Sequence, residues 1–168
     1  MDALKDFNAW PIERARAELL RCCGSPRWAE RMAAGRPYAD AAALYAAAEH
    51  VWRGLEARDW EEAFREHPRI GGRDALRAKF AATRAWAQGE QAGVREAEEA
   101  VLEALAEGNR LYEERFGRLF IVCATGKSAS EMLALLKARL ANAPEAELAA
   151  AAGEQEKITR LRLEKMLR

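Results

Sequence analysis

The residues best suited to chemistry in this sequence begin with His67, in the stretch His-Pro-Arg-Ile-Gly-Gly-Arg at positions 67–73. Pro68 disfavours the helical conformation in the residue before it, so a helix that runs into His67 should end there. Gly71 and Gly72 allow a tight turn or a close approach of the backbone to a ligand. Because an imidazole changes its charge near neutral pH, a histidine held here could transfer protons. A simple helix end with an exposed histidine explains the same residues, and both interpretations stay open at this point.

Polar residues also interrupt helical regularity at Gln88-Gly89-Glu90-Gln91-Ala92-Gly93 and at the run from Ile121 to Gly126. Such interruptions are typical of functional sites, where local sequence rules are relaxed. Each has an ordinary explanation when taken alone. Glu90 and Gln91 suit the start of a helix, and Arg162 is one of many arginines that would lie on the surface by default.

The sequence contains an odd number of cysteines, namely Cys22, Cys23 and Cys123. Neighbouring positions on a helix do not face each other, and a metal cluster would need more Cys or His than His50 and His67 supply. We therefore predict no metal site, and reduced, mostly buried thiols in a reducing compartment. Cys123 is a poor candidate nucleophile because no second histidine is near it in the sequence.

Two other patterns carry little chemistry. Thr125-Gly126-Lys127-Ser128 is similar to the end of a phosphate-binding P-loop, but that motif needs a glycine where Ile121 stands, so we exclude it. A cluster of four glutamates without matching histidines is most simply a solvated helix face. These residues are Glu96, Glu98, Glu99 and Glu103.

The overall composition is that of a folded globular chain. Of 168 residues half are apolar and 32% are charged, with 27 basic and 27 acidic side chains. This balance favours neither nucleic acid nor an anionic membrane as a partner, and no apolar run approaches the roughly 18 residues of a membrane span. The segment from Met1 to Asp6 lacks a secretory signal pattern, and Met166-Leu167-Arg168 is not a peroxisomal address, so we expect a cytoplasmic location.

The elements that must position these residues are predicted to be helices. Apolar positions recur with a helical period, and Ser25-Pro26, Asp40 and Asp74 are typical of helix starts. Asp59 with Glu62 and Ser128 with Glu131 match capping boxes. These signals predict helices over about 11–24, 25–35, 40–55, 59–67, 74–89, 90–115, 128–142 and 144–167.

The apolar run from Leu119 to Ala124 has the composition of a strand, but it stands alone. A single strand has no ladder partner, so we expect a short extended segment that crosses the core. The predicted fold is an all-α, single-domain bundle over residues 1–168, with one extended segment near 119–125.

Taken together, the motifs resemble those of the OHCU decarboxylase family, which acts on 2-oxo-4-hydroxy-4-carboxy-5-ureidoimidazoline (OHCU). The resemblance covers almost the whole chain and rests on six motifs in order: His-Pro-Arg-Ile-Gly at 67–71, Glu-Gln-Ala-Gly at 90–93, Asn109 to Gly117, Phe120 to Ser128, Arg-Leu-Ala-Asn at 139–142, and Lys157-Ile158-Thr159 followed by Arg162-Leu163.

The resemblance implies a decarboxylation without a cofactor, which converts OHCU to (S)-allantoin at the end of the conversion of urate in purine catabolism. Loss of carbon dioxide leaves electron density that is delocalised into the neighbouring imine and must be protonated from one face. It also implies a homodimer, with a small-molecule substrate and neither nucleic acid nor membrane as a partner.

By the same resemblance, His67 is the catalytic acid and base, which suits an imidazole with an ordinary pKa near 6.5, and Glu90 orients it or the substrate hydroxyl. Arg162 would meet the substrate carboxylate with its guanidinium. Pro68 would shape the pocket and Gln91 would hydrogen-bond the ureido or ring amide. The rest of the substrate ring would contact the backbone groups of Phe120, Ile121, Val122, Cys123 and Ala124.

One position departs from the family. A serine usually stands three residues before the Glu-Gln pair, where this chain has Ala87, so its hydroxyl contact is lost or replaced by Gln88 or a water. Two alternatives therefore stay open: an enzyme of the same fold that acts on another ureido-imidazoline acid, and a non-enzymatic all-α module that binds a partner helix.

Overall fold

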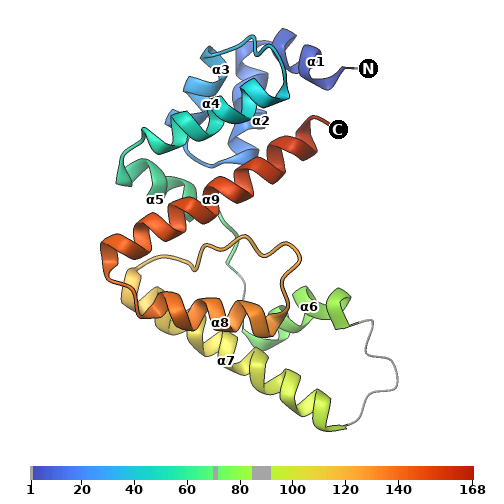
Figure 1. Cartoon of the computed structure of the whole chain (residues 1–168), viewed down its shortest axis with the longest axis vertical. Helices are drawn as coiled ribbons and strands as arrows, with labels where there is room; N and C mark the ends of the chain where they lie inside the picture. Colours follow the sequence, from blue (N-terminus) through green and yellow to red (C-terminus); the bar gives the residue numbers. More distant parts are fainter. Residues whose placement is uncertain (1, 70–71, 85–91) are drawn as a thin grey trace. The chain divides into compact units, whose positions relative to one another are not determined.

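A computed structural model of the chain describes residues 2–69, 72–84 and 92–168 (Figure 1). Within these ranges the structure contains nine helices and no strand, which confirms the all-α prediction. The helices are α1 (Ala3–Ala9), α2 (Ile12–Cys22), α3 (Pro26–Ala34), α4 (Ala41–Arg53), α5 (Ala57–Arg65), α6 (Arg73–Arg84), α7 (Ala92–Phe116), α8 (Ala129–Leu140) and α9 (Pro144–Met166). None of these described helices is long and apolar enough to cross a membrane.

The chain divides into two compact units, which we describe separately. The first unit comprises Met1–His67, Ile121–Cys123 and Leu148–Arg168, and the second comprises Pro68–Phe120 and Ala124–Glu147. The single domain expected over residues 1–168 stays a prediction.

The first unit is built on indole side chains that are buried yet fully hydrogen-bonded. Trp28 donates from Nε1 to the carbonyl oxygen of Ala48 at 3.1 Å, and Trp52 donates to that of Ala152 at 2.9 Å. Burial of a large aromatic surface favours folding, and the polar N–H is not left unpaired. The second of these bonds joins α4 to α9 and so fixes the helix that carries Arg162.

Local side-chain chemistry sets most helix starts of this unit. Ser25 accepts from Trp28 N and Asp40 accepts from Ala43 N, so both predicted N-caps are confirmed. The sequence analysis missed α1, whose N-cap Asp2 accepts from the backbone N–H groups of Leu4 and Lys5.

The prediction that Asp59 caps α5 is wrong. The helix begins at Ala57 with Glu56 as N-cap, and Asp59 lies in the first turn, where Oδ2 accepts from the N–H of Glu56 at 3.1 Å. Asp59 therefore occupies the third position of a capping box that starts three residues earlier. The predicted end of this helix is close to that observed, because α5 ends at Arg65 and His67 follows in a turn.

A similar correction applies to α6, which begins at Arg73, so Asp74 lies in its first turn and not at its cap. There it accepts from Arg77 Nη1 at 3.0 Å. In α8 the prediction holds, because Ser128 is the N-cap and accepts from Glu131 N.

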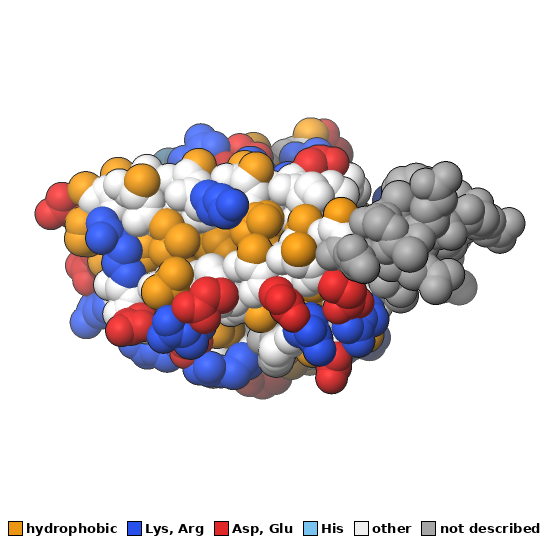
Figure 2. Space-filling view, turned by 90° about the horizontal axis from the view of Figure 1, so that it is seen from below, with side chains coloured by type: hydrophobic (Ala, Val, Ile, Leu, Met, Phe, Trp, Pro, Cys, Tyr) orange, Lys and Arg blue, Asp and Glu red, His pale blue; other side chains and the backbone are white. Residues whose placement is uncertain are grey.

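The second unit contains α6, α7, α8 and the first turn of α9, with the α7–α8 pair at its centre. Gly108 permits the close approach of this pair, because a Cβ at that position would lie 2.6 Å from Leu136 Cδ2. Figure 2 shows a face on which hydrophobic side chains form a stripe bordered by charged groups. Leu111 on α7 is 42% exposed, one of the few large hydrophobic side chains exposed among the described residues.

A buried carboxylate ties the helices of the second unit together. Glu147 accepts from Tyr112 at 2.5 Å, from Arg139 Nε at 2.8 Å and from Asn142 at 3.0 Å. Both Arg139 and Glu147 are buried, so the ion pair excludes water and depends on these additional hydrogen bonds. The cluster fixes the end of α8 against the start of α9.

Candidate active site

The candidate active site begins at His67, which ends the first of the three chain segments in the first unit and lies just beyond the end of α5. Its backbone N–H donates to the carbonyl oxygen of Phe64 at 3.2 Å, so the turn after the helix fixes where the ring begins. The ring is half-buried, and its Nε2 lies 2.5 Å from Oε1 of Gln155 on α9. The histidine is therefore held in a defined position and not freely exposed.

Gln155 belongs to a polar row on the face of α9 that is turned into the first unit. Gln155, Thr159 and Arg162 follow a spacing of four and then three residues, which places them on one side of a helix. Gln155 is fully buried and donates from Nε2 to Thr159 Oγ1 at 3.1 Å. A buried amide needs such partners, and both its oxygen and its nitrogen have one.

Arg162 lies at the end of this row, where it donates from Nη1 to the carbonyl oxygen of Cys22 at 3.3 Å. The side chain is half-buried, so part of the guanidinium stays available to another partner. It also acts on His67 electrostatically. The structure thus brings together His67 and Arg162, which the sequence analysis had singled out 95 positions apart.

The environment of His67 favours its neutral form. Burial lowers its pKa from 6.5 and the positive charge of Arg162 lowers it further, although the hydrogen bond to Gln155 opposes both effects. The imidazole is therefore a proton acceptor at neutral pH.

The thiols of Cys22 and Cys23 are free and buried, as predicted. Burial raises the pKa of each to about 11, so they are protonated at neutral pH. Ser25 and Thr159 lower the pKa of the Cys23 thiol, but burial raises it by more. These cysteines therefore support the site as neutral groups and are not poised as nucleophiles.

The predicted extended segment is confirmed as irregular backbone from Leu119 to Ala124, without a ladder partner among the described residues. In the first unit, Ile121 and Cys123 are buried and Val122 is half-buried. The N–H of Cys123 donates to Oε1 of Glu154 at 3.3 Å, which joins the segment to α9 one residue before Gln155.

The two ends of the predicted segment belong to the second unit. Ala124 is half-buried, and the ring of Phe120 packs edge-on against Tyr112 at 5.2 Å between centroids, with the Arg139 guanidinium 4.5 Å from its centre. These contacts give Phe120 a packing role. Pro68 also belongs to the second unit and is exposed.

Four predicted site residues lie outside the described residues: Ala87, Gln88, Glu90 and Gln91. Conversely, the sequence analysis missed Gln155 and Thr159. The signal that could have found them is the row of polar side chains at helical spacing that leads to Arg162, in a part of α9 where the other buried residues, Ala151, Ala152 and Leu163, are apolar.

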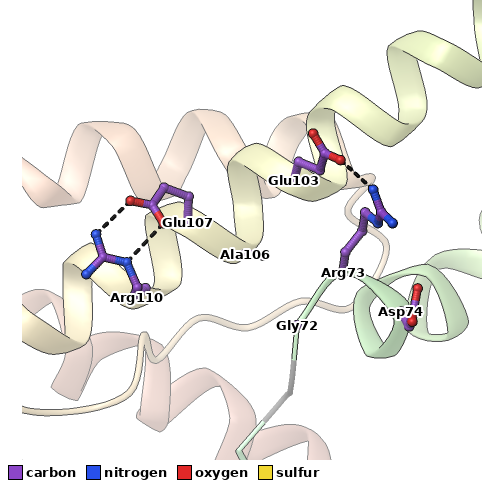
Figure 3. A pocket seen from close by; sticks show the side chains of 7 residues that line it. All are labelled: Gly72, Arg73, Asp74, Glu103, Ala106, Glu107 and Arg110. Carbon is purple, nitrogen blue, oxygen red and sulfur yellow. Dashed lines mark hydrogen bonds and ion pairs between the residues drawn. The ribbon is translucent and has the colours of Figure 1, made fainter.

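A hollow of about 580 Å³ lies in the second unit between the start of α6 and the middle of α7 (Figure 3). Its charged side chains pair with one another: Arg73 bonds to Glu103, and Arg110 bonds to Glu107 at 2.7 Å. Its lining comprises Gly72, Arg73, Asp74, Glu103, Ala106, Glu107 and Arg110. No set of His, Cys, Asp and Glu suited to a metal ion occurs among the described residues.

Comparison with known proteins gives one consistent result. Residues 8–164 match the OHCU decarboxylase family. The chain is 37% identical over 145 residues to the uric acid degradation bifunctional protein TTL of Arabidopsis thaliana, and 36% identical over 138 residues to the 2-oxo-4-hydroxy-4-carboxy-5-ureidoimidazoline decarboxylase of Amia calva. The matches cover 86% and 79% of this chain, but only 45% of the Arabidopsis protein and 75% of the Amia protein.

Solved structures agree. A crystal structure of OHCU decarboxylase in the presence of (S)-allantoin is 36% identical with a TM-score of 0.71, and the match covers 89% of this chain and 96% of that one. A crystal structure titled (S)-allantoin synthase shares the fold, with a TM-score of 0.69 at 20% identity, over 98% of this chain and 54% of that one. The family match spans nearly the entire sequence and the relatives exceed 30% identity, so this chain belongs to the OHCU decarboxylase family.

Proposed function

We propose that this protein decarboxylates OHCU to (S)-allantoin, without a cofactor, in the degradation of urate. The observation that carries the proposal is the placement of His67 and Arg162 in one unit, linked through Gln155 and α9. A proton-transfer group and a fixed cation are what the reaction needs, since the substrate loses a carboxylate and its product gains a proton.

In the proposed reaction the bond between the ring carbon and the carboxylate breaks and carbon dioxide leaves. The electron pair of that bond shifts into the adjacent imine, and the resulting intermediate accepts a proton at carbon from one face. His67 is neutral when the substrate arrives, so it removes the proton of the substrate hydroxyl, which becomes a carbonyl, and the imidazolium then supplies that proton to carbon. The nitrogen that received the electron pair takes up one proton from water. Because the His67 imidazole is held in one position, it would protonate the intermediate from one face and give one enantiomer.

Arg162 is proposed to bind the substrate carboxylate. A guanidinium presents paired donors that match the two oxygens of a carboxylate, and the Arg162 side chain is partly buried. The contact to the Cys22 carbonyl oxygen uses one donor group and orients the rest.

The other members of the proposed site follow from the family resemblance. Glu90 would orient His67 or the substrate hydroxyl, and Gln91 would bind the ureido or ring amide. Pro68 and the backbone from Phe120 to Ala124 would complete the pocket. Ala87 stands at the position of the family serine, whose hydroxyl contact is lost or replaced by Gln88 or a water. Turnover of freshly generated OHCU, followed by optical activity, tests the proposal.

We also propose a homodimer, which the family resemblance suggests. The exposure of Leu111 on α7 is compatible with a further apolar contact. Light scattering after size-exclusion chromatography should give twice the mass of the 18.7 kDa chain, and a mass of one chain would reject the dimer.

The cytoplasm is the proposed location. The support is that three buried cysteines are all free, which suits a reducing compartment. Fractionation of the source cells with an antibody against the chain would place it.

A further inference from the structure

The carboxamide of Gln155 has a position in this site that neither the family motifs nor the reaction assigns. It is fully buried, it lies 88 residues from His67 in the sequence, and its oxygen is the nearest polar atom to His67 Nε2. We propose that Gln155 is a positioning residue that holds neutral His67 as the tautomer with its hydrogen on Nε2, so that Nδ1 is the atom that exchanges protons with the substrate.

The direction of the Gln155 amide follows from its second contact. A carboxamide can be turned by half a rotation, which would exchange its oxygen and nitrogen, so the hydrogen-bond network must decide between the two orientations. Gln155 Nε2 lies 3.1 Å from Thr159 Oγ1. If the Thr159 hydroxyl hydrogen is used elsewhere, that oxygen can only accept, and the amide nitrogen must face it.

In the structure the Gln155 NH₂ group donates to Thr159 Oγ1, and Oε1 is the atom on the side of His67. The lowering effect of Thr159 on the pKa of the buried Cys23 thiol supports the same orientation, since a hydroxyl that donates to sulfur leaves its oxygen to accept from the amide. The amide oxygen is left to face His67, where an imidazole can satisfy it only by donating from Nε2.

The other ring nitrogen is then free for chemistry. Within the part of the chain that the structure describes, Gln155 is the one hydrogen-bond partner of the His67 ring. A neutral imidazole that donates from Nε2 carries a lone pair on Nδ1, which makes Nδ1 the base and, once protonated, the acid. The charged side chain that acts on this ring is Arg162, while Cys22 and Cys23 face the same row of α9 as neutral thiols.

The inference rests on the proposed function for its catalytic meaning, but the tautomer can be measured without substrate. The chain has only two histidines, so ¹⁵N-labelled imidazole gives two sets of long-range ¹H–¹⁵N signals, and His50→Asn assigns them. Exposed His50 on α4 serves as an internal reference in the same sample. Above its pKa, wild-type His67 should show a protonated Nε2 and a lone pair on Nδ1.

Two substitutions of Gln155 test its positioning role. Gln155→Leu should give a mixture of tautomers, and kcat for OHCU should fall about tenfold with KM within about twofold, since one oriented hydrogen bond is lost. Gln155→Glu keeps an acceptor oxygen, so it should preserve the Nε2–H tautomer while its negative charge raises the pKa of His67.

Thr159 offers a matched pair if Gln155→Leu does not fold. Thr159→Val keeps the shape but loses the hydroxyl, and should weaken the tautomer preference; Thr159→Ser keeps the hydroxyl and should behave like wild type. A wild-type His67 with its hydrogen on Nδ1 would overturn the inference, as would an unchanged tautomer in both Gln155→Leu and Thr159→Val. If wild-type His67 shows the expected tautomer but the protein does not turn over OHCU, the proposed function is rejected and the positioning role of Gln155 stands.

Discussion

Nε2 of His67 and Oε1 of Gln155 lie 2.5 Å apart, although 88 residues separate them in the sequence. This contact joins the turn after α5 to the middle of α9, so the imidazole that follows the end of α5 is held in place. The helix end predicted from the His-Pro motif is confirmed, but the histidine is not freely exposed. The helix ends just before His67, and the ring is directed to a buried partner.

Replacement of His67 by asparagine tests the proton-transfer role. His67→Asn should lower kcat for OHCU by roughly a hundredfold to ten-thousandfold, the usual contribution of a general acid or base, with an unchanged circular dichroism spectrum. His50→Asn is the matched control, because His50 is exposed on α4 and should leave turnover unchanged. Near-normal activity of His67→Asn would remove His67 from the mechanism.

The pH dependence of kcat/KM should reflect the neutral form of His67. Burial and Arg162 lower its pKa from 6.5, so activity should be constant above pH 6.5 and fall only in more acidic solution. Cys22 and Cys23, with pKa values raised to about 11, do not titrate in this range. An NMR titration of His67 should give the same midpoint as the rate profile. A midpoint above 6.5 would show that the charged form is the one favoured.

Arg162 can be tested by two variants that differ in charge. Both Arg162→Lys and Arg162→Gln lose the guanidinium fork and should lower kcat/KM by about ten- to a hundredfold, mainly through KM. Only Arg162→Gln removes the positive charge that lowers the pKa of His67, so only that variant should move the acid limb of the profile to higher pH.

Arg160→Gln is the control for both Arg162 variants. Arg160 lies on the same helix but pairs with Glu164 at 2.8 Å and stacks 3.8 Å over the ring of Tyr45. It should retain normal kcat/KM. Equal losses in the Arg160 and Arg162 variants would indicate damage to α9 and not a substrate contact.

The stability of the second unit should depend on Glu147. Glu147→Leu leaves Arg139 buried without its carboxylate, and should lower the free energy of unfolding by about 3–5 kcal/mol in a urea titration. Tyr112→Phe removes one hydrogen bond to the same carboxylate and should cost about 1–2 kcal/mol. Arg21→Ala breaks a surface pair in which Arg21 is 79% exposed, and should cost about 0–1 kcal/mol.

The same carboxylate sets a pH effect on stability. Burial raises the pKa of Glu147, but hydrogen bonds from Arg139, Tyr112 and Asn142 lower it by more, so the net shift is downward. A lowered pKa in the folded state means that this stabilisation is complete above the pKa of the unfolded chain and is lost as the pH falls through the folded value. If Glu147→Leu were as stable as wild type at neutral pH, the cluster would have no such role.

Local rules predicted much of the fold because a helix start depends on a few adjacent residues. Ser25, Asp40 and Ser128 were assigned correctly from their own side chains and the helical period that follows them. Asp59 was misplaced because Glu56 and Asp59 are both acidic and three residues apart, so either can begin a capping box. The short helix α1 was missed because Met1 to Asp6 was assessed only for a secretory signal and not for a helix cap at Asp2.

The site was predicted less completely for a physical reason. His67 and Arg162 belong to sequence motifs, so a family resemblance could find them. Gln155 and Thr159 matter through contacts made across the fold, and their sequence signal is weak, because it consists of their helical spacing to Arg162. Their role follows from the folded structure, in which α9 contacts the end of α2 and the turn after α5.

The most direct measurement adds the protein to freshly generated OHCU and records carbon dioxide release together with the circular dichroism of the allantoin formed. The proposed function predicts faster release than in buffer and an optically active product with the (S) configuration. Carbon dioxide release at the uncatalysed rate, with racemic allantoin, would contradict it.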